Sequence, residues 1–231
     1  MTEIRDIDVV VFDVLGTLVD EPDGIGAAVR EALSDAEQAT VDESVTLWQR
    51  HVETEQTRIA RGERAYADTA VIDAEAAQLV ADRAGIADAA VIARLAKAGQ
   101  RLVPWEDTVS GLERLSWHFP VIGLSNAGLS ALLRLNAFAG LRFHLALSSE
   151  LAGAYKPAPE VYRLALDAAG CAPERVLMVA AHAWDLRGAQ AVGMRTAYIG
   201  RSVGDPPKDT DTFDGHFDGL EALTAALVAG A

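Results

Sequence analysis

The sequence predicts an α/β fold built on a doubly wound parallel sheet, with a helical segment inserted near its beginning. Short β-branched runs alternate with amphipathic stretches through most of the chain. Residues 21–98 break this alternation, because they are rich in Ala, Glu and Arg and carry apolar residues at helical spacing. The 231 residues suffice for one core and a smaller appended domain. We therefore expect a core formed by residues 1–20 and 99–231, and a helical domain formed by residues 21–98.

The expected elements follow from local signals taken in chain order. Val9–Phe12 is a buried-strand run inside a first strand at 8–13, and Gly16 allows the sharp turn after it. Turn-forming residues at 21–24 and 99–104 mark the two ends of the helical segment. The other strands are expected at 120–125, 144–148, 176–181 and 195–199. The core helices are expected at 107–117, 128–138, 159–169, 184–192 and 218–229, and a polar loop at 200–212.

Composition excludes several classes of function. The formal net charge of −14 argues against nucleic acid, whose phosphates require basic patches. No apolar run approaches the length of a membrane span, and the acidic N-terminus does not read as a secretory signal. The single cysteine, Cys171, allows no internal disulfide, which suits a cytoplasmic protein. We expect Cys171 to be a packing residue rather than a nucleophile.

The first strand places an aspartate where open α/β sheets carry their chemistry. Asp13 follows the apolar run, at the carboxyl end of the expected strand. A carboxylate there can act as a nucleophile, a metal ligand or a base, and the alternative is an aspartate that only caps a turn. The residue two positions later is Leu15, so a second acid is absent from this turn.

Four sequence motifs occur in the same order as those of a known protein family. They are FDVLGTLVD at 12–20, GLSNAG at 123–128, AYKPAPEVY at 154–162 and VLMVAAHAWDLRGAQAVGM at 176–194. Together they resemble the haloacid dehalogenase superfamily. The AWD sequence at 183–185 and the missing second aspartate most resemble its type II (S)-2-haloacid dehalogenase branch. The resemblance implies a Rossmann-like core with a helical cap over its catalytic end.

The resemblance also implies a reaction through an aspartyl ester. Asp13 would displace halide from the carbon next to a carboxyl group, and water would then hydrolyse the ester. In the phosphatase branch a second aspartate protonates the leaving oxygen, whereas halide leaves without a proton. Leu15 is therefore compatible with dehalogenation, although dehalogenases of this branch usually carry tyrosine there. Leu15 is assigned to substrate binding.

Three further residues would complete the catalytic group. Lys156 matches the family lysine that contacts the nucleophile, and its ammonium would keep Asp13 ionised. Asp185 would orient or activate the hydrolytic water. Thr17 would hydrogen-bond the surroundings of the nucleophile and stabilise the charged carbonyl oxygen during ester hydrolysis. Tyr162 matches a family tyrosine near the lysine, with ordinary helix packing as its alternative.

The remaining substrate-binding candidates come from three places in the chain. Ser125 and Asn126 end the second core strand, where they suit a substrate carboxylate or, alternatively, cap the next helix. His182 replaces the usual asparagine, and Trp184 is a candidate pocket wall; structural roles are the alternative for both. In the cap, Leu47-Trp48 is followed by Gln49 where the family has an arginine.

The arginines near Gln49 are not simple replacements. Arg50 is one residue later, about 100° around a helix. Arg58, Arg61 and Arg64 are other cap cations, and as a set spaced three residues apart they are also typical of a solvated face.

The same motifs predict a site without a metal or cofactor. Phosphatases of the superfamily hold Mg²⁺ with acids after the fourth strand, and this sequence has Ala180 and Ala181 there. We expect a small anionic organic substrate, no nucleic acid or membrane partner, and leave a homodimer open. An atypical phosphatase and a non-catalytic binding protein are the alternative functions. Intact Asp13, Lys156 and Asp185 argue against the binding protein.

Overall fold

The fold is known from a computed structural model that describes residue 4 and residues 6–33 and 37–229. Residues 1–3, 5, 34–36 and 230–231 lie outside the described part. They include part of the N-terminal stretch that we interpreted as lacking a secretory signal, and the ends of the expected core. Within the described part, no helix has both the length and the apolarity needed to cross a membrane.

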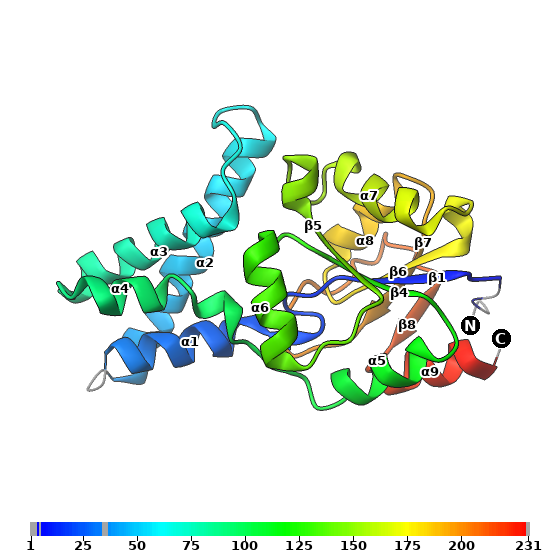
Figure 1. The fold of residues 1–231 in the computed structure, drawn as a ribbon, viewed down its shortest axis with the longest axis horizontal. Coiled ribbons are helices and arrows are strands. Elements are labelled where there is room, and N and C mark those ends of the chain that lie inside the picture. Colours follow the sequence, from blue (N-terminus) through cyan, green and yellow to red (C-terminus); the bar gives the residue numbers. More distant parts are fainter. Residues whose placement is uncertain (1–3, 5, 34–36, 230–231) are drawn as a thin grey trace.

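The core is a six-stranded sheet in which neighbouring strands run parallel (Figure 1). Its strand order is β5-β4-β1-β6-β7-β8. The strands are β1 (Val9–Phe12), β4 (Val121–Ser125), β5 (Leu145–Ser148), β6 (Val176–Ala180), β7 (Arg195–Ile199) and β8 (Gly215–Phe217). The predicted α/β fold is confirmed, and β1 lies between β4 and β6 in the middle of the sheet.

Helices cover both faces of the sheet, because β1 is apolar on both sides. Val10 and Phe12 belong to one buried cluster, and Val9 and Val11 to another. The first cluster includes residues of the helices α5 (Thr108–Ser116), α6 (Leu129–Ala139) and α9 (Leu220–Ala229). The second includes residues of α7 (Pro159–Ala169) and α8 (Ala183–Gln190). Continuous apolar runs are typical of strands that are buried on both faces.

A separate group of helices lies beside one end of this core (blue to green in Figure 1). It consists of α1 (Glu21–Ala32), α2 (Gln38–Ala60), α3 (Thr69–Ala84) and α4 (Ala89–Leu95). These helices share their own apolar cluster, which contains Ile25, Trp48 and Val80. Two short antiparallel strands, β2 (Val19–Asp20) and β3 (Val103–Pro104), pair where the chain leaves and re-enters the core.

The expected core elements agree with the structure to within two residues at each end. Sequence reasoning did not predict three strands. β8 is short and contains a glycine and a histidine, so it lacks a β-branched run. The β2–β3 pair contains only two residues per strand and one proline, and it exists because tertiary structure brings the two connections together.

Candidate active site

The predicted catalytic residues converge at the carboxyl edge of the sheet. Asp13 directly follows β1, Asn126 directly follows β4, and Asp185 lies in the first turn of α8, shortly after β6. Lys156 arrives from the connection after β5, which includes a short 3-10 helix at Ser149–Ala152. Parallel strands end at one edge, so residues far apart in sequence meet there.

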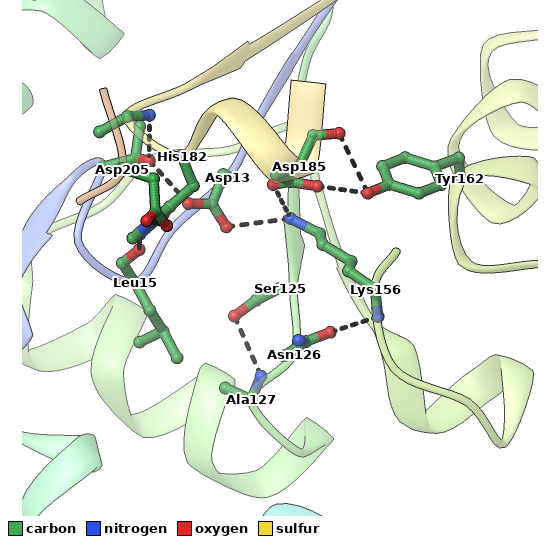
Figure 2. A network of polar contacts seen from close by, with 12 residues as sticks. Asp13, Leu15, Ser125, Asn126, Ala127, Lys156, Tyr162, His182, Asp185 and Asp205 are labelled. Carbon is green, nitrogen blue, oxygen red and sulfur yellow. Dashed lines mark hydrogen bonds and ion pairs between the residues drawn. The ribbon is translucent and has the colours of Figure 1, made fainter. Parts of the chain in front are cut away.

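Lys156 is the central charge of this group (Figure 2). Its Nζ lies 2.9 Å from Oδ1 of Asp13 and 2.8 Å from Oδ2 of Asp185. Asp13 is 6% exposed, Lys156 is 5% exposed and Asp185 is fully buried. The ammonium therefore bridges two buried carboxylates, and each of its short contacts is charge-assisted.

The protonation of this group follows from burial and charge together. Burial alone would lower the pKa of Lys156, but the charges of Asp13 and Asp185 outweigh it, and the pKa is raised. Lys156 therefore keeps its charge at neutral pH. Burial raises the pKa of Asp185, although Lys156 opposes the shift, and Asp13 adds to it. One ammonium thus lies between two buried carboxylates.

Tyr162 lies behind Asp185. Its hydroxyl donates to Oδ1 of Asp185 at 2.6 Å and is 3.1 Å from the backbone oxygen of the same residue. Burial next to Asp185 raises the pKa of Tyr162, so the phenol remains a donor. Tyr162 is fully buried and is not among the residues that line the cavity described below, so its contact is with Asp185.

Thr17 contacts the other carboxylate oxygen of Asp13. Its hydroxyl donates to Oδ2 of Asp13 at 2.6 Å and accepts from the N–H of Ala181 at 2.9 Å. Both carboxylate oxygens of Asp13 therefore have a donor. This arrangement holds the carboxylate in one orientation.

A cavity of about 660 Å³ opens between these residues and the helical group. Its walls come from both parts of the chain. Of the predicted site residues, it is lined by Asp13, Leu15, Gln49, Asn126, Lys156, His182 and Trp184. Thr17, Ser125, Tyr162 and Asp185 support this wall from behind without lining it.

Ser125 and Asn126 differ in what they face. Ser125 is fully buried, and its Oγ accepts from the N–H of Ala127 at 3.1 Å, so it organises the turn before α6. Asn126 lines the cavity, and its Oδ1 accepts from the N–H of Lys156 at 2.9 Å. Its Nδ2 lies 3.5 Å from Oε1 of Gln56 on α2. Asn126 thus joins the lysine connection to the helical group.

His182 lies against the turn that follows Asp13, with both ring nitrogens near acceptors. Nε2 is 3.2 Å from the carbonyl oxygen of Leu15, and Nδ1 is 3.4 Å from Oδ2 of Asp205. Only the doubly protonated ring donates to both. Burial would lower its pKa, but Asp13 and other nearby acids outweigh burial and raise it. A Cβ on Gly16 would lie 2.6 Å from Nε2, and Gly16 has a φ of +76°, so glycine is required there.

The cavity is poor in arginine on its helical side. Gln49 lines it, and Arg50, Arg58, Arg61 and Arg64 are absent from the residues described as its lining. Arg58 and Arg64 instead bind Glu55, at 2.9 Å and 2.6 Å. Arg64 also binds Glu75 at 2.7 Å. Arg64 thus joins α2 to α3, whereas the Arg58 pair lies within α2. Among the described lining residues, the basic side chains are Lys156 and His182.

Sequence reasoning missed four acids that line the same cavity: Glu21, Glu53, Asp73 and Asp205. Burial raises the pKa of Glu21 to about 7, His182 opposes the shift and Asp13 adds to it. Burial also raises the pKa of Asp73 to about 8, and Glu21 and Asp68 add to that shift. Glu21 starts α1 and Asp73 lies inside α3, where an acid is an ordinary helix-surface residue, so no sequence signal identified them.

Fold and site together define an α/β protein with a lysine between two buried carboxylates at the carboxyl edge of a parallel sheet. Comparison with known proteins identifies the family of this chain. The family model described as haloacid dehalogenase-like hydrolase matches residues 7–193. The chain belongs to this family.

Several similar curated proteins are named (S)-2-haloacid dehalogenases. The chain is 30% identical over 207 residues to (S)-2-haloacid dehalogenase 4A of Burkholderia cepacia, covering 86% of this chain and 84% of that protein. It is 32% identical over 197 residues to (S)-2-haloacid dehalogenase 1 of Pseudomonas sp. (strain CBS-3), covering 83% of each.

Solved structures agree with this grouping. A defluorinating L-2-haloacid dehalogenase superposes with a TM-score of 0.86 at 28% identity, over 96% of this chain and 95% of that one. The L-2-haloacid dehalogenase of Xanthobacter autotrophicus with chloropropionic acid covalently bound gives 0.82 at 26% identity, over 97% and 99%.

Proposed function

We propose that the chain removes halide hydrolytically from short 2-haloacids through an aspartyl ester on Asp13. The observation that carries the proposal is the arrangement at Asp13. The carboxylate faces a cavity, holds a donor on each oxygen and has Leu15 where a leaving-group acid would stand. The similar curated (S)-2-haloacid dehalogenases support the choice of substrate.

In the first step, Asp13 attacks the carbon that bears the halogen. A bond forms between a carboxylate oxygen and that carbon while the carbon–halogen bond breaks, and halide leaves with the electron pair. The ammonium of Lys156 pairs with the attacking carboxylate at 2.9 Å. The carboxylate attacks opposite the departing halide, so this step inverts the carbon, and the net configuration stays inverted because the second step does not touch that carbon.

In the second step, water attacks the carbonyl carbon of the Asp13 ester. The developing negative charge falls on the Asp13 oxygen that is not bonded to the substrate. That oxygen keeps its own donor, which is Thr17 for Oδ2 and Lys156 for Oδ1. We assign Asp185 to orient this water and accept its proton, because burial raises its pKa towards that of a useful base. The products are the hydroxy acid, a proton and restored Asp13.

The helices of residues 21–98 act in this proposal as a cap over the cavity, with Gln49 facing the substrate. Asn126 and the imidazolium of His182 attract the substrate carboxylate from the core side, and Trp184 forms an apolar wall. Ser125 and Tyr162 act indirectly, through the Ala127 turn and Asp185.

Catalysis is proposed to be independent of metal. Lys156 lies between Asp13 and Asp185, where a cation would otherwise balance the two acids. Ala180 and Ala181, fully buried at the end of β6, bring no oxygen side chain to this place. A homodimer and a cytoplasmic location stay predictions.

Single-turnover labelling tests the ester. Excess enzyme in water with labelled oxygen should give a product without label and place the label in Asp13. Asp13→Asn should abolish halide release, and Asp185→Asn should release halide once and retain the acyl mass. Label appearing directly in the product would refute the ester. Phosphate release from phosphate esters without halide release from chiral 2-haloacids would favour a phosphatase.

A further inference from the structure

The turn that carries the nucleophile is held from outside through its backbone carbonyls. Trp105 Nε1 donates to the oxygen of Gly16 at 3.1 Å, and Arg201 Nε donates to the oxygen of Thr17 at 2.9 Å. The oxygen of Leu18 accepts from the N–H of Trp105 at 3.1 Å and from the hydroxyl of Thr108 at 2.8 Å. Three consecutive carbonyls therefore have donors from distant parts of the chain.

Arg201 is the charged member of this set and is itself fixed. Its side chain is 7% exposed, and its guanidinium lies 5.7 Å from the centre of the Trp105 ring. Nη1 lies 2.9 Å from Oδ1 of Asp107 and 3.1 Å from Oδ2. Oδ2 of Asp107 also accepts from the N–H of Leu220 at 2.6 Å. A buried guanidinium is costly unless it is paired, and Asp107 supplies the pair.

The contact with Thr17 connects Arg201 to the nucleophile. The hydrogen bond to the carbonyl of Thr17 fixes the backbone of this residue. It thereby fixes the position from which the Thr17 hydroxyl projects. That hydroxyl makes the 2.6 Å hydrogen bond to Oδ2 of Asp13. Arg201 itself is absent from the described cavity lining, so it would act through Thr17 and not on the substrate.

We propose that Arg201, held by Asp107, is a positioning residue that orients Thr17 and thereby the carboxylate of Asp13. The proposal rests on the proposed function in taking Asp13 as the nucleophile. Because Arg201 is proposed to align Asp13, loss of the Arg201 side chain should lower kcat. KM should change little, because the cavity wall is intact.

Arg201→Ala tests the proposal against a matched control. The control is Arg195→Ala, because Arg195 pairs with Asp214 at 2.7 Å and Asp214 also accepts a backbone N–H, from Thr196 at 2.8 Å. We expect Arg201→Ala to lower kcat for halide release about 10- to 100-fold, as for a small misplacement of reacting groups. KM should stay within about twofold, and methylguanidinium should restore part of kcat. Arg195→Ala should keep the wild-type kcat.

A second readout separates this proposal from the proposed function. The N–H of Leu18 donates to the oxygen of Val14 at 2.9 Å across the nucleophile turn, and its hydrogen exchange needs no substrate. Exchange there should be faster in Arg201→Ala and unchanged in Arg195→Ala. If no haloacid released halide, the proposed function would fail, but the exchange rate at Leu18 would still test whether Arg201 holds the turn.

The conservative variant Arg201→Lys controls for a simple loss of folded structure. Arg201→Lys keeps the charge beside Asp107, but one ammonium cannot occupy the positions of both Nε and Nη1. It should fold, lower kcat and speed exchange at Leu18. Unchanged kcat with unchanged exchange in either Arg201 variant would overturn the positioning role, as would an equal loss of kcat in Arg195→Ala.

Discussion

The ammonium of Lys156 and the carboxylate of Asp13 meet at 2.9 Å although 143 residues separate them in the chain. Lys156→Met would leave Asp13 and Asp185 buried without a counter-charge. Breaking a buried pair costs about 3–5 kcal/mol of unfolding free energy. We expect that loss in urea unfolding, together with at least about a 100-fold loss in halide release. Lys97→Met, at an exposed position, is the control, and wild-type stability in Lys156→Met would contradict the pairing.

Tyr162→Phe should act on the second chemical step. The change removes the 2.6 Å hydrogen bond to Asp185 and keeps the ring in its buried site. Hydrogen bonds to charged groups contribute about 1.5–3 kcal/mol, so a loss of that size is expected in urea unfolding. Rapid-quench mass measurements should show ester accumulating on Asp13. Slower ester formation with unchanged hydrolysis would show that Tyr162 has another role.

Activity on anionic haloacids should fall as pH rises through about 7 to 8. The pKa values of Glu21 and Asp73 are raised to about 7 and about 8, so each acid is neutral below its pKa and negative above it. The ionised acids would repel the substrate anion inside the shared cavity. Glu21→Gln and Asp73→Asn should each flatten the decline in kcat/KM. Glu63→Gln, at an exposed position, should retain the wild-type profile, and an unaltered profile in the two cavity variants would refute this cause.

Gln49→Arg should raise halide release. Gln49 lines the cavity, and an arginine there would offer charge-assisted hydrogen bonds to carboxylate or halide. A missing donor of this kind costs about 2–4 kcal/mol of transition-state stabilisation, so recovering part of it corresponds to about a tenfold gain in kcat/KM. Arg50→Gln, a neighbour outside the described lining, should change little. If Gln49→Arg left the rate of halide release unchanged and Arg50→Gln abolished it, then Arg50, not Gln49, would bind the substrate.

Chelation should leave halide release unchanged. Lys156 provides the positive charge between Asp13 and Asp185, so no step in the proposed reaction requires a cation there. The measurement is the turnover rate before and after exhaustive dialysis against a chelator, with Mg²⁺ added back. Strict restoration of activity by Mg²⁺ would favour phosphatase chemistry instead.

The sequence by itself determined the sheet except for its edge strand β8, and also the edge at which the site forms. Apolar β-branched runs such as Val9–Phe12 are local signals, and so are the helix starts at Pro159 and the glycine turn at Gly16. Asp13, Lys156 and Asp185 were predicted together because each follows such a run or lies in a recognisable motif. The family resemblance then assigned their chemistry.

Only the tertiary structure decided which side chains face the cavity and which support its wall. Ser125 and Asn126 are adjacent, yet one turns inward to Ala127 and the other faces the cavity. Glu21, Asp73 and Arg201 carry no local signal, because their roles come from partners that the fold brings from distant segments. Burial and pairing depend on such long-range contacts, which the spacing of residues along a chain does not encode.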